Sequence, residues 1–317
     1  MITTLAAIAM ATSVPEPVDI GRVFTKGEKL QYEVKSTIQA QIRQGELQTF
    51  LPQDFDINYK FTTEVVSLKA DGIGEIRYSR PTVTEIEGET ADSMPKTKVT
   101  KLGWLFLLEV SPINDLVKMT DLKPPAKKKD TRIRAWSSAE GEHVQTLDVG
   151  QFIGEIHRLS LFAGGVDSAL DFSPKLPYDP VAVGETWKRT VGYSPQTLKG
   201  AGDKSAVQRL DYEYTYRGIV ESGGRKVHRV TADLKLDTDA AKFINQALRM
   251  RPDQSGLKEM KLILDATIEF DLDLKTRRTL EARAKSTGSV KIEGTELGNT
   301  YEEKINGGST MTLVASK

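Results

Sequence analysis

The sequence predicts a mainly β protein with a few helices, built from two related halves of long antiparallel hairpins that could close partly into barrels. Three observations support this fold class. Apolar and polar residues alternate over unusually long segments, helical spacing is confined to short stretches, and similar strand-opening motifs recur about half a chain apart. Alternation with a period of two is typical of strands that bury one face.

The strongest alternation covers residues 260–274, where every even position is apolar. Fifteen residues at about 3.3 Å each predict a strand of roughly 50 Å, much longer than average. The alternation resumes over 279–284, so residues 275–278 are predicted to form the turn of a long hairpin. The apolar positions are Met260, Leu262, Leu264, Ala266, Ile268, Phe270, Leu272 and Leu274.

Three further hairpins are predicted. Residues 57–65 and 73–78 alternate on either side of Asp71-Gly72, and residues 210–217 and 230–236 flank Ser222-Gly223-Gly224. These turn sequences contain residues that tolerate positive φ. For residues 104–117, Ser111-Pro112 is compatible with either a helix start or a turn, and we favour a hairpin.

Helical spacing is found in two segments. Residues 149–163 carry apolar side chains at helical intervals and end at Gly164-Gly165, a typical stop. A second helix is predicted to start at Asp237 or Thr238 as N-cap and to end at Arg251, before Pro252. Either helix could cover one side of a curved sheet.

The two halves are predicted from a repeated motif. Lys26-Gly27-Glu28 and Val183-Gly184-Glu185 each open a strand, about half the chain length apart, and we interpret this as a duplication. The predicted organisation is a signal-peptide-like segment (1–19), a first β-rich half (20–172), a proline-rich linker (173–182) and a second β-rich half (183–317). Pro174, Pro177 and Pro180 mark the linker, because they cannot all lie inside a regular element.

Residues 2–11 form a short apolar run that contains Ala9-Met10-Ala11, a small-x-small pattern typical of signal-peptide cleavage. We therefore expect an exported protein, in the periplasm, the cell envelope or the extracellular space. About ten apolar residues are too few to span a bilayer. The rest of the sequence contains no longer apolar run, so no transmembrane segment is expected.

Composition excludes several functional classes. Lys and Arg number 44 and Asp and Glu number 44, so the net charge is zero and no nucleic-acid partner is expected. The basic run at 127–129 is interpreted as a solvated loop. There is no cysteine, which excludes disulfides, thiol nucleophiles and zinc–thiolate sites.

The polar residues predict neither a metal site nor a cofactor. Of His143, His157 and His228, the latter two have no second ligand at helical or strand spacing, so a structural or surface role is expected for the histidines. The alternate acids of one strand would lie about 7 Å apart, too far to share an ion without other strands. We interpret them as a solvated face with Lys275 and Arg277 as counter-charges. These acids are Glu269, Asp271 and Asp273.

No Gly-x-Ser-x-Gly elbow and no phosphate-binding loop is present, so we expect a protein that is not an enzyme. The aromatic residues are predicted to pack in the core, although a tyrosine ladder could also offer a stacking surface to sugar or peptide. They are Trp104, Trp136 and Trp187, and the ladder Tyr212, Tyr214 and Tyr216.

The linker and the strand after it read Leu-Pro-Tyr-Asp-Pro-Val-Ala-Val-Gly-Glu-Thr-Trp over residues 176–187. With the Gly27-Glu28 strand opening, this segment resembles a family of exported bacterial proteins and lipoproteins of unknown function. Their second half opens with Leu-Pro-x-x-Pro-Val-x-x-Gly-[Asp/Glu]-x-Trp. The resemblance covers most of the chain after residue 20. It implies an exported protein and assigns no catalytic residue.

Together these observations predict a non-catalytic exported envelope protein that binds an apolar or amphiphilic ligand such as a lipid. Leu264, Ile268, Phe270 and Leu272, on the apolar face of the longest strand, are the candidate contacts. Two alternatives stay open. One is a structural or protein-interaction module with a dry core, and the other is a hydrolase with convergent carboxylates.

Overall fold

The computed structural model describes residues 16–44, 48–88, 94–122, 173–193, 208–242, 257–294 and 301–316. These residues form eleven strands and one short 3-10 turn at Ala70–Gly72. The strands are β1 (Lys29–Gln44), β2 (Leu51–Leu68), β3 (Gly74–Glu87), β4 (Lys96–Val110), β5 (Leu116–Asp121), β6 (Thr186–Tyr193), β7 (Gln208–Ser222), β8 (Arg225–Asp239), β9 (Leu257–Leu272), β10 (Thr279–Gly294) and β11 (Tyr301–Ser316).

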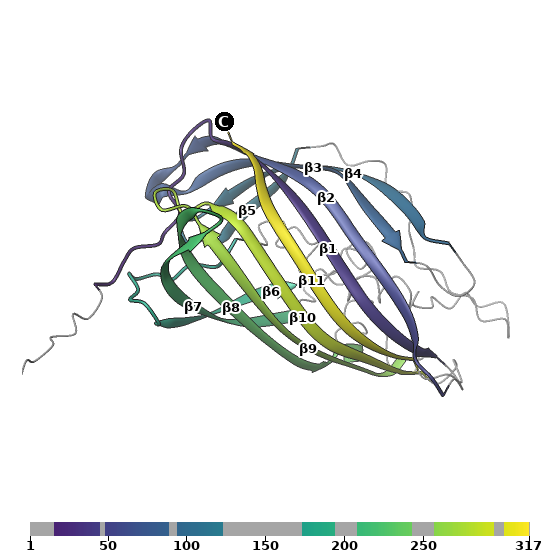
Figure 1. The fold of residues 1–317 in the computed structure, drawn as a ribbon. Coiled ribbons are helices and arrows are strands. Elements are labelled where there is room, and N and C mark those ends of the chain that lie inside the picture. Colours follow the sequence, from purple (N-terminus) through teal and green to yellow (C-terminus); the bar gives the residue numbers. More distant parts are fainter. Residues whose placement is uncertain are drawn as a thin grey trace, which may run out of the picture.

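All eleven strands belong to a single sheet in the order β5-β4-β3-β2-β1-β11-β10-β9-β8-β7-β6. Every neighbouring pair is antiparallel, and the sheet curves strongly without closing, so β5 and β6 are its edges (Figure 1). The predicted mainly β fold class is therefore confirmed. The first and last strands, β1 and β11, pair along their full length from Leu30↔Ser316 to Gln44↔Tyr301, and this pairing joins the two halves into one sheet.

The predicted hairpins are present. The longest alternating segment is β9, a strand of 16 residues that pairs with β10 across a turn at residues 273–278. Strands β2 and β3, β4 and β5, and β7 and β8 form the other three hairpins. Gly223 and Gly224 connect β7 to β8 with φ of 57° and 75°, the positive values that a tight two-residue hairpin requires.

The two Gly-Glu motifs adopt the same backbone geometry. Gly27 and Gly184 have φ of 86° and 90°, which glycine adopts without strain. The Glu28 N–H donates to Thr25 O, and the Glu185 N–H donates to Ala182 O. In each case the glycine N–H and the glutamate carbonyl then bond the neighbouring strand. The motifs are thus equivalent in structure, while descent from a duplication stays a prediction.

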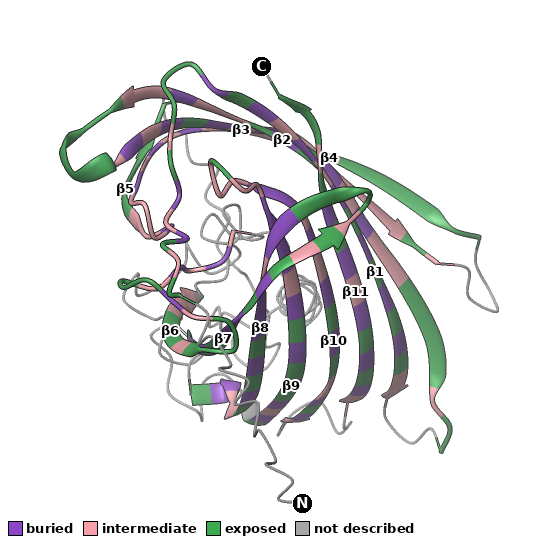
Figure 2. Ribbon diagram, turned by 60° about the vertical axis from the view of Figure 1, so that its left-hand side comes forward, coloured by how far each residue is buried: buried purple, intermediate pink, exposed green. Residues whose placement is uncertain are grey.

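Buried and exposed residues alternate along the strands of the curved sheet (Figure 2). One face therefore carries the buried apolar side chains, and we call it the concave inner face. The cross-strand register places these side chains directly opposite one another, so they form continuous buried rows across the sheet. One row runs from β7 to β3 through residues that are each at most 9% exposed. It consists of Tyr216, Val230, Phe270, Ala282, Met311, Val34, Tyr59 and Val83.

The predicted tyrosine ladder of β7 belongs to this core. Tyr212, Tyr214 and Tyr216 are all buried, which confirms core packing rather than an exposed stacking surface. Trp187 of β6 stacks on Tyr214 with ring centroids 5.6 Å apart, and Trp104 of β4 packs half-buried against Phe106. Trp136 lies outside the described residues.

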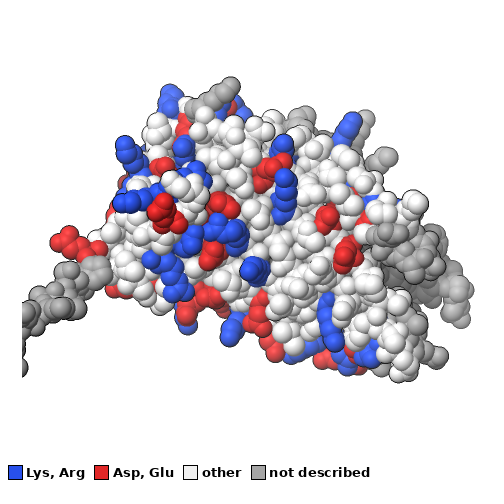
Figure 3. Space-filling model, viewed as in Figure 1, with Lys and Arg blue, Asp and Glu red and all other residues white. Residues whose placement is uncertain are grey.

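The outer face carries intermingled charges of both signs, in keeping with the net charge of zero (Figure 3). The prediction that Asp271 belongs to a solvated face was wrong. Its side chain is only 1% exposed and accepts hydrogen bonds from Arg229, Arg283 and Ser222. The counter-charges come from the neighbouring strands because cross-strand residues lie closer than alternate residues on one strand. Arg229 and Arg283 therefore take the place that Lys275 and Arg277 were expected to fill.

The expected cap of the second helix is also corrected. Strand β8 continues to Asp239 because Thr238 and Asp239 still pair with β9, and helical residues begin at Ala240. The Asp239 carboxylate accepts from the Ala241 N–H at 3.0 Å and from the Met260 N–H at 3.1 Å. Residues 243–251, the helix predicted at 149–163, the signal-peptide-like run at 2–11 and the basic run at 127–129 lie outside the described residues.

His228 is structural, as expected. It is 3% exposed on β8, and its Nδ1 lies 2.8 Å from the Tyr216 hydroxyl. Burial lowers the pKa of His228, and the positive charge of Arg277 lowers it further. His143 and His157 lie outside the described residues.

Candidate functional site

The candidate site consists of the apolar inner face and a small charged cavity at one end of it. The four predicted contact residues all lie on the inner face, at even-numbered positions of β9. Each is at most 4% exposed. Strands β1 to β4 and β7 to β11 all contribute buried apolar side chains to this face. The four residues are Leu264, Ile268, Phe270 and Leu272.

The inner face differs in character from one side to the other. On β1 to β4 it is aromatic: Tyr32 stacks on Phe61 at 5.0 Å, and Phe61 lies 5.4 Å from Tyr78. In its centre the side chains are small. The central positions on β10, β11 and β1 include Ala282, Ala284, Ser286, Ser309, Ser36 and Ala40, all buried.

One charged side chain lies within the aromatic part. Arg80 of β3 is completely buried, and its guanidinium carbon lies 4.0 Å from the Tyr59 ring centre and 4.9 Å from that of Trp104. Its Nε donates to the Tyr78 hydroxyl at 2.8 Å. Stacking on aromatic faces is a favourable environment for a guanidinium. Sequence reasoning did not identify Arg80, because an arginine within an alternating strand carries no distinguishing signal.

Two segments outside the strands close one end of the sheet, and we call them the closing segments: residues 16–28 and residues 173–181. The second comprises most of the proline-rich linker (173–182) and lies against both sheet edges. Next to β5, the Leu176 N–H donates to Ile113 O at 3.0 Å. In β6, Arg189 donates to Leu176 O at 2.7 Å and also contacts the Asp115 carboxylate at 2.6 Å.

The first closing segment joins the same end of the sheet to the β9–β10 turn. The Arg22 N–H donates to Pro112 O, and the Val23 N–H donates to Thr276 O. Val18 forms an isolated antiparallel bridge with Val181, so the two closing segments also contact each other. The sheet edges are thereby connected at the end where β1 begins.

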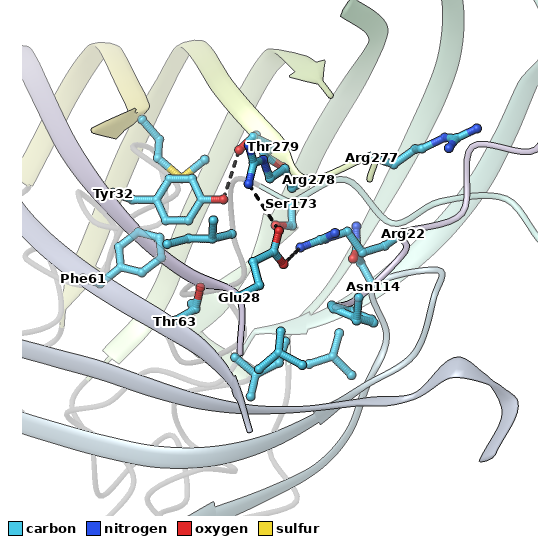
Figure 4. Close-up of a pocket in the computed structure, with 16 residues that line it drawn as sticks. Arg22, Glu28, Tyr32, Phe61, Thr63, Asn114, Ser173, Arg277, Arg278 and Thr279 are labelled. Atoms are coloured by element: carbon cyan, nitrogen blue, oxygen red, sulfur yellow. Dashed lines mark hydrogen bonds and ion pairs between the residues drawn. The ribbon is translucent and has the colours of Figure 1, made fainter. Parts of the chain in front are cut away.

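A cavity of about 50 Å³ lies beneath the closing segments (Figure 4). One part of its wall belongs to the inner face and is apolar: Leu30, Tyr32, Phe61, Val65, Ile76, Val110 and Met311. The other part is polar and comes from the first closing segment and the turns: Arg22, Glu28, Thr63, Asn114, Ser173, Arg277, Arg278 and Thr279. The cavity therefore has an apolar side and a charged side.

Glu28 is the centre of the charged side. One of its carboxylate oxygens pairs with Arg22, and the other lies 3.3 Å from Nη1 of Arg278 (Figure 4). The side chains of Glu28 and Arg22 are 8% and 7% exposed. Two guanidiniums thus share one buried carboxylate, and a third, that of Arg277, also lines the cavity, so positive charge is in excess there.

Arg22 and Arg278 differ in whether their remaining N–H groups have hydrogen-bond partners. Arg22 is also bonded to backbone carbonyls, at Thr276 O with 2.9 Å and at Val23 O. Arg278 has a buried Nε for which the described residues provide no hydrogen-bond partner. Arg277 points away from Glu28, and its Nη2 donates to Asp19 O at 3.1 Å (Figure 4).

Tyr32 links the charged side to the inner face. Its hydroxyl donates to Thr279 O at 3.0 Å, and burial raises the pKa of Tyr32. The nearby Arg22 counteracts part of that rise. Tyr32 is therefore a neutral donor at physiological pH, and its ring forms part of the apolar wall.

Sequence reasoning did not assign this cavity. Glu28 was noted only as part of a strand-opening motif, and Arg22 and Arg278 lie about 250 positions apart in the chain. The Gly-Glu motif predicts the local backbone conformation but not whether its glutamate is buried. Glu28 is buried, whereas the equivalent Glu185 is exposed. Its carboxylate accepts from the Ala182 N–H at 2.7 Å.

The described residues contain no group of three His, Cys, Asp or Glu side chains placed to hold a metal ion. Among the helices that the structure describes, none has the length and apolar character needed to cross a membrane. Within this part of the chain, Arg22 and Arg278 pair with Glu28, while the buried Nε atoms of Arg277 and Arg278 have no hydrogen-bond partner.

No protein-family model and no curated protein sequence matches the chain. Among solved structures, similarity is found to lipovitellin, with a TM-score of 0.45 and 8% identity over 93% of this chain. The chain spans only 26% of the lipovitellin chain.

Two bacterial structures show weaker similarity. A mutant porin from Rh. blastica gives a TM-score of 0.20 with 10% identity, over 90% of this chain and 99% of the porin. The translocator domain of the autotransporter NalP from Neisseria meningitidis gives 0.12 with 8% identity, over 91% and 89%. All three TM-scores lie below 0.5, so the argument for function rests on the geometry of this chain.

Proposed function

We propose that this protein is a non-catalytic, exported protein of the cell envelope that binds an apolar or amphiphilic ligand on the inner face of its sheet. The observation that carries the proposal is the width of that face. Buried apolar side chains extend in register across the sheet, as the row from Tyr216 to Val83 illustrates. In the described part of the chain, no second sheet packs on it.

A surface of this size cannot stay exposed to water. An apolar sheet face must be covered by protein or by an apolar ligand, because its exposure to water costs about 25 cal/mol per Å². Concave curvature suits a ligand that is enclosed on several sides, since binding sites for small molecules are concave and mostly apolar. The small side chains in the centre and the aromatic side chains of β1 to β4 give this face two kinds of contact surface.

Export is supported by the sequence, through the apolar run at 2–11 and the resemblance to exported bacterial proteins. Absence of catalysis is supported by the pairing of Glu28, the carboxylate that lines the cavity, with Arg22 and Arg278. A dry-core interaction module and a carboxylate hydrolase are the competing functions, and binding measurements distinguish them from a ligand-binding protein.

Binding of the neutral rod-shaped probe diphenylhexatriene tests the proposal. We expect saturable binding, detected as a rise in probe fluorescence, because the probe leaves water for the apolar face. Ser309→Leu should weaken binding about fivefold, since the added side chain occupies the centre of the inner face opposite Ser36 and Ala284.

The matched control is Thr310→Leu, which places the same side chain on the exposed outer face of β11. It should leave the affinity unchanged, and thermal unfolding of both variants establishes that they are folded. A wild-type protein that shows no saturable binding would argue for the dry-core module. Equal weakening by the two substitutions would place the probe elsewhere than on the inner face.

A further inference from the structure

We propose that the cavity beneath the closing segments binds the carboxylate of a long-chain carboxylic acid, with Arg278 as its counter-ion. This inference rests on the proposed function and specifies the ligand. The carboxylate would lie between the charged side of the cavity and Tyr32, and the alkyl chain would lie on the inner face. Three features of the cavity support this assignment: its net charge, its free donor and its volume.

The charge of the cavity favours an anion. The guanidiniums of Arg22, Arg277 and Arg278 line it together with a single carboxylate, that of Glu28, so positive charge is in excess at the cavity wall. Partly buried cations of this kind are costly unless they are paired and hydrogen-bonded. An anionic ligand group would offset part of this excess, whereas a neutral headgroup would not.

The donors of the cavity indicate which residue meets the ligand. Arg22 is held by Glu28 and two backbone carbonyls, so its role is structural. Arg278 contacts the Glu28 carboxylate at 3.3 Å, and its buried Nε has no hydrogen-bond partner among the described residues. A guanidinium binds a carboxylate through two parallel hydrogen bonds, for which Nε and one terminal nitrogen suffice.

The volume limits what the cavity can hold. Its volume of about 50 Å³ is the space open to the centres of water molecules, and one water needs roughly 10–15 Å³ of such space. The cavity can therefore hold a small charged group such as a carboxylate. A whole alkyl chain is far too large, so the chain must extend out of the cavity.

The apolar part of the wall gives the direction in which the chain leaves. Tyr32, Phe61 and Met311 line the cavity and also belong to the buried core of the inner face. Met311 lies opposite Ala282 of β10 and Val34 of β1, within the central region of small side chains. The polar and apolar parts of an amphiphile thus meet surfaces of matching character without a gap between them.

Parinaric acid and its methyl ester test this assignment, because they share one fluorescent chain and differ only in the charge of the headgroup. At pH 7.5 the wild-type protein should bind the acid at least tenfold more tightly than the ester. Arg278→Gln should abolish this preference by weakening the acid, while the affinity for the ester stays within twofold of wild type. Arg278→Lys, which keeps the charge but not the two-pronged geometry, should retain part of the preference.

The unchanged ester affinity also establishes that Arg278→Gln is folded. Arg77→Gln is the matched control, since Arg77 is exposed on the outer face and pairs with Glu64. It should leave the preference for the acid intact. Equal affinities for acid and ester in the wild type, or a preference that survives Arg278→Gln, would overturn the carboxylate assignment while leaving the proposed function standing. Failure of both probes to bind would overturn both.

Discussion

Replacement of Glu28 by Gln should lower the free energy of unfolding by about 3 kcal/mol, the lower end of the range for breaking a buried ion pair. The substitution keeps the shape of the side chain but removes the charge that Arg22 and Arg278 share. Two guanidiniums would then face each other at the closed end of the sheet with no anion between them. Urea unfolding followed by circular dichroism measures the change.

The chain contains its own control for this experiment. Glu185 occupies the equivalent position in the second Gly-Glu motif, with the same backbone hydrogen bonds, but it is exposed. Glu185→Gln should therefore cost less than about 1 kcal/mol. The double substitution Glu28→Gln and Arg278→Gln should recover part of the loss, because it also removes one of the unpaired cations. Equal effects of the two single substitutions would contradict the role given to burial.

Replacement of Asp271 by Asn should lower the free energy of unfolding by a similar amount, about 3 kcal/mol. The Asp271 carboxylate accepts from Arg229 at 2.8 Å, from Ser222 at 2.7 Å and from Arg283 at 3.0 Å. The neutral amide cannot pair with both arginines. Asp233→Asn is the matched control, because Asp233 is an exposed aspartate that accepts from the neutral Thr267 hydroxyl, at 2.7 Å.

The difference in unfolding free energy between the wild type and Asp271→Asn should depend on pH, which gives a second test. Burial alone would raise the pKa of Asp271, but hydrogen bonds from Arg229, Ser222 and Arg283 hold it below its usual value. A carboxyl group whose pKa is lower in the folded state stabilises the fold above the pKa of the unfolded chain, about 3.9. The wild-type advantage over Asp271→Asn should stay constant from pH 7 to about pH 5 and shrink as the pH falls below about 4. An advantage that grows in acid would contradict this account.

Much of the fold could be predicted because β-strand patterning is a local property. Alternation in residues 260–274 defined β9 and its buried face, and the turn residues at 71–72 and 222–224 fixed the hairpins around them. What alternation cannot reveal is which strand lies next to which. The pairing of β1 with β11 joins residues more than 250 positions apart, and only this pairing turns two halves into one sheet.

The candidate site was predictable in its apolar part and not in its charged part. Phe270 and its neighbours were found because apolar character repeats along a strand. Glu28 and Arg278 come from a strand-opening motif and a turn, and their burial depends on closing segments that contain no regular structure. The same limitation explains Asp271, whose partners lie on two adjacent strands rather than along its own.

Mass spectrometry of organic extracts from protein purified without detergent tests whether the inner face holds an apolar molecule. We expect a long-chain lipid, with a free carboxylic acid as the main species, in near-equimolar amount to the protein. Thr310→Leu should carry the same amount, and Ser309→Leu should carry less. Extracts that contain only the traces found with an unrelated soluble protein purified in parallel would contradict the account.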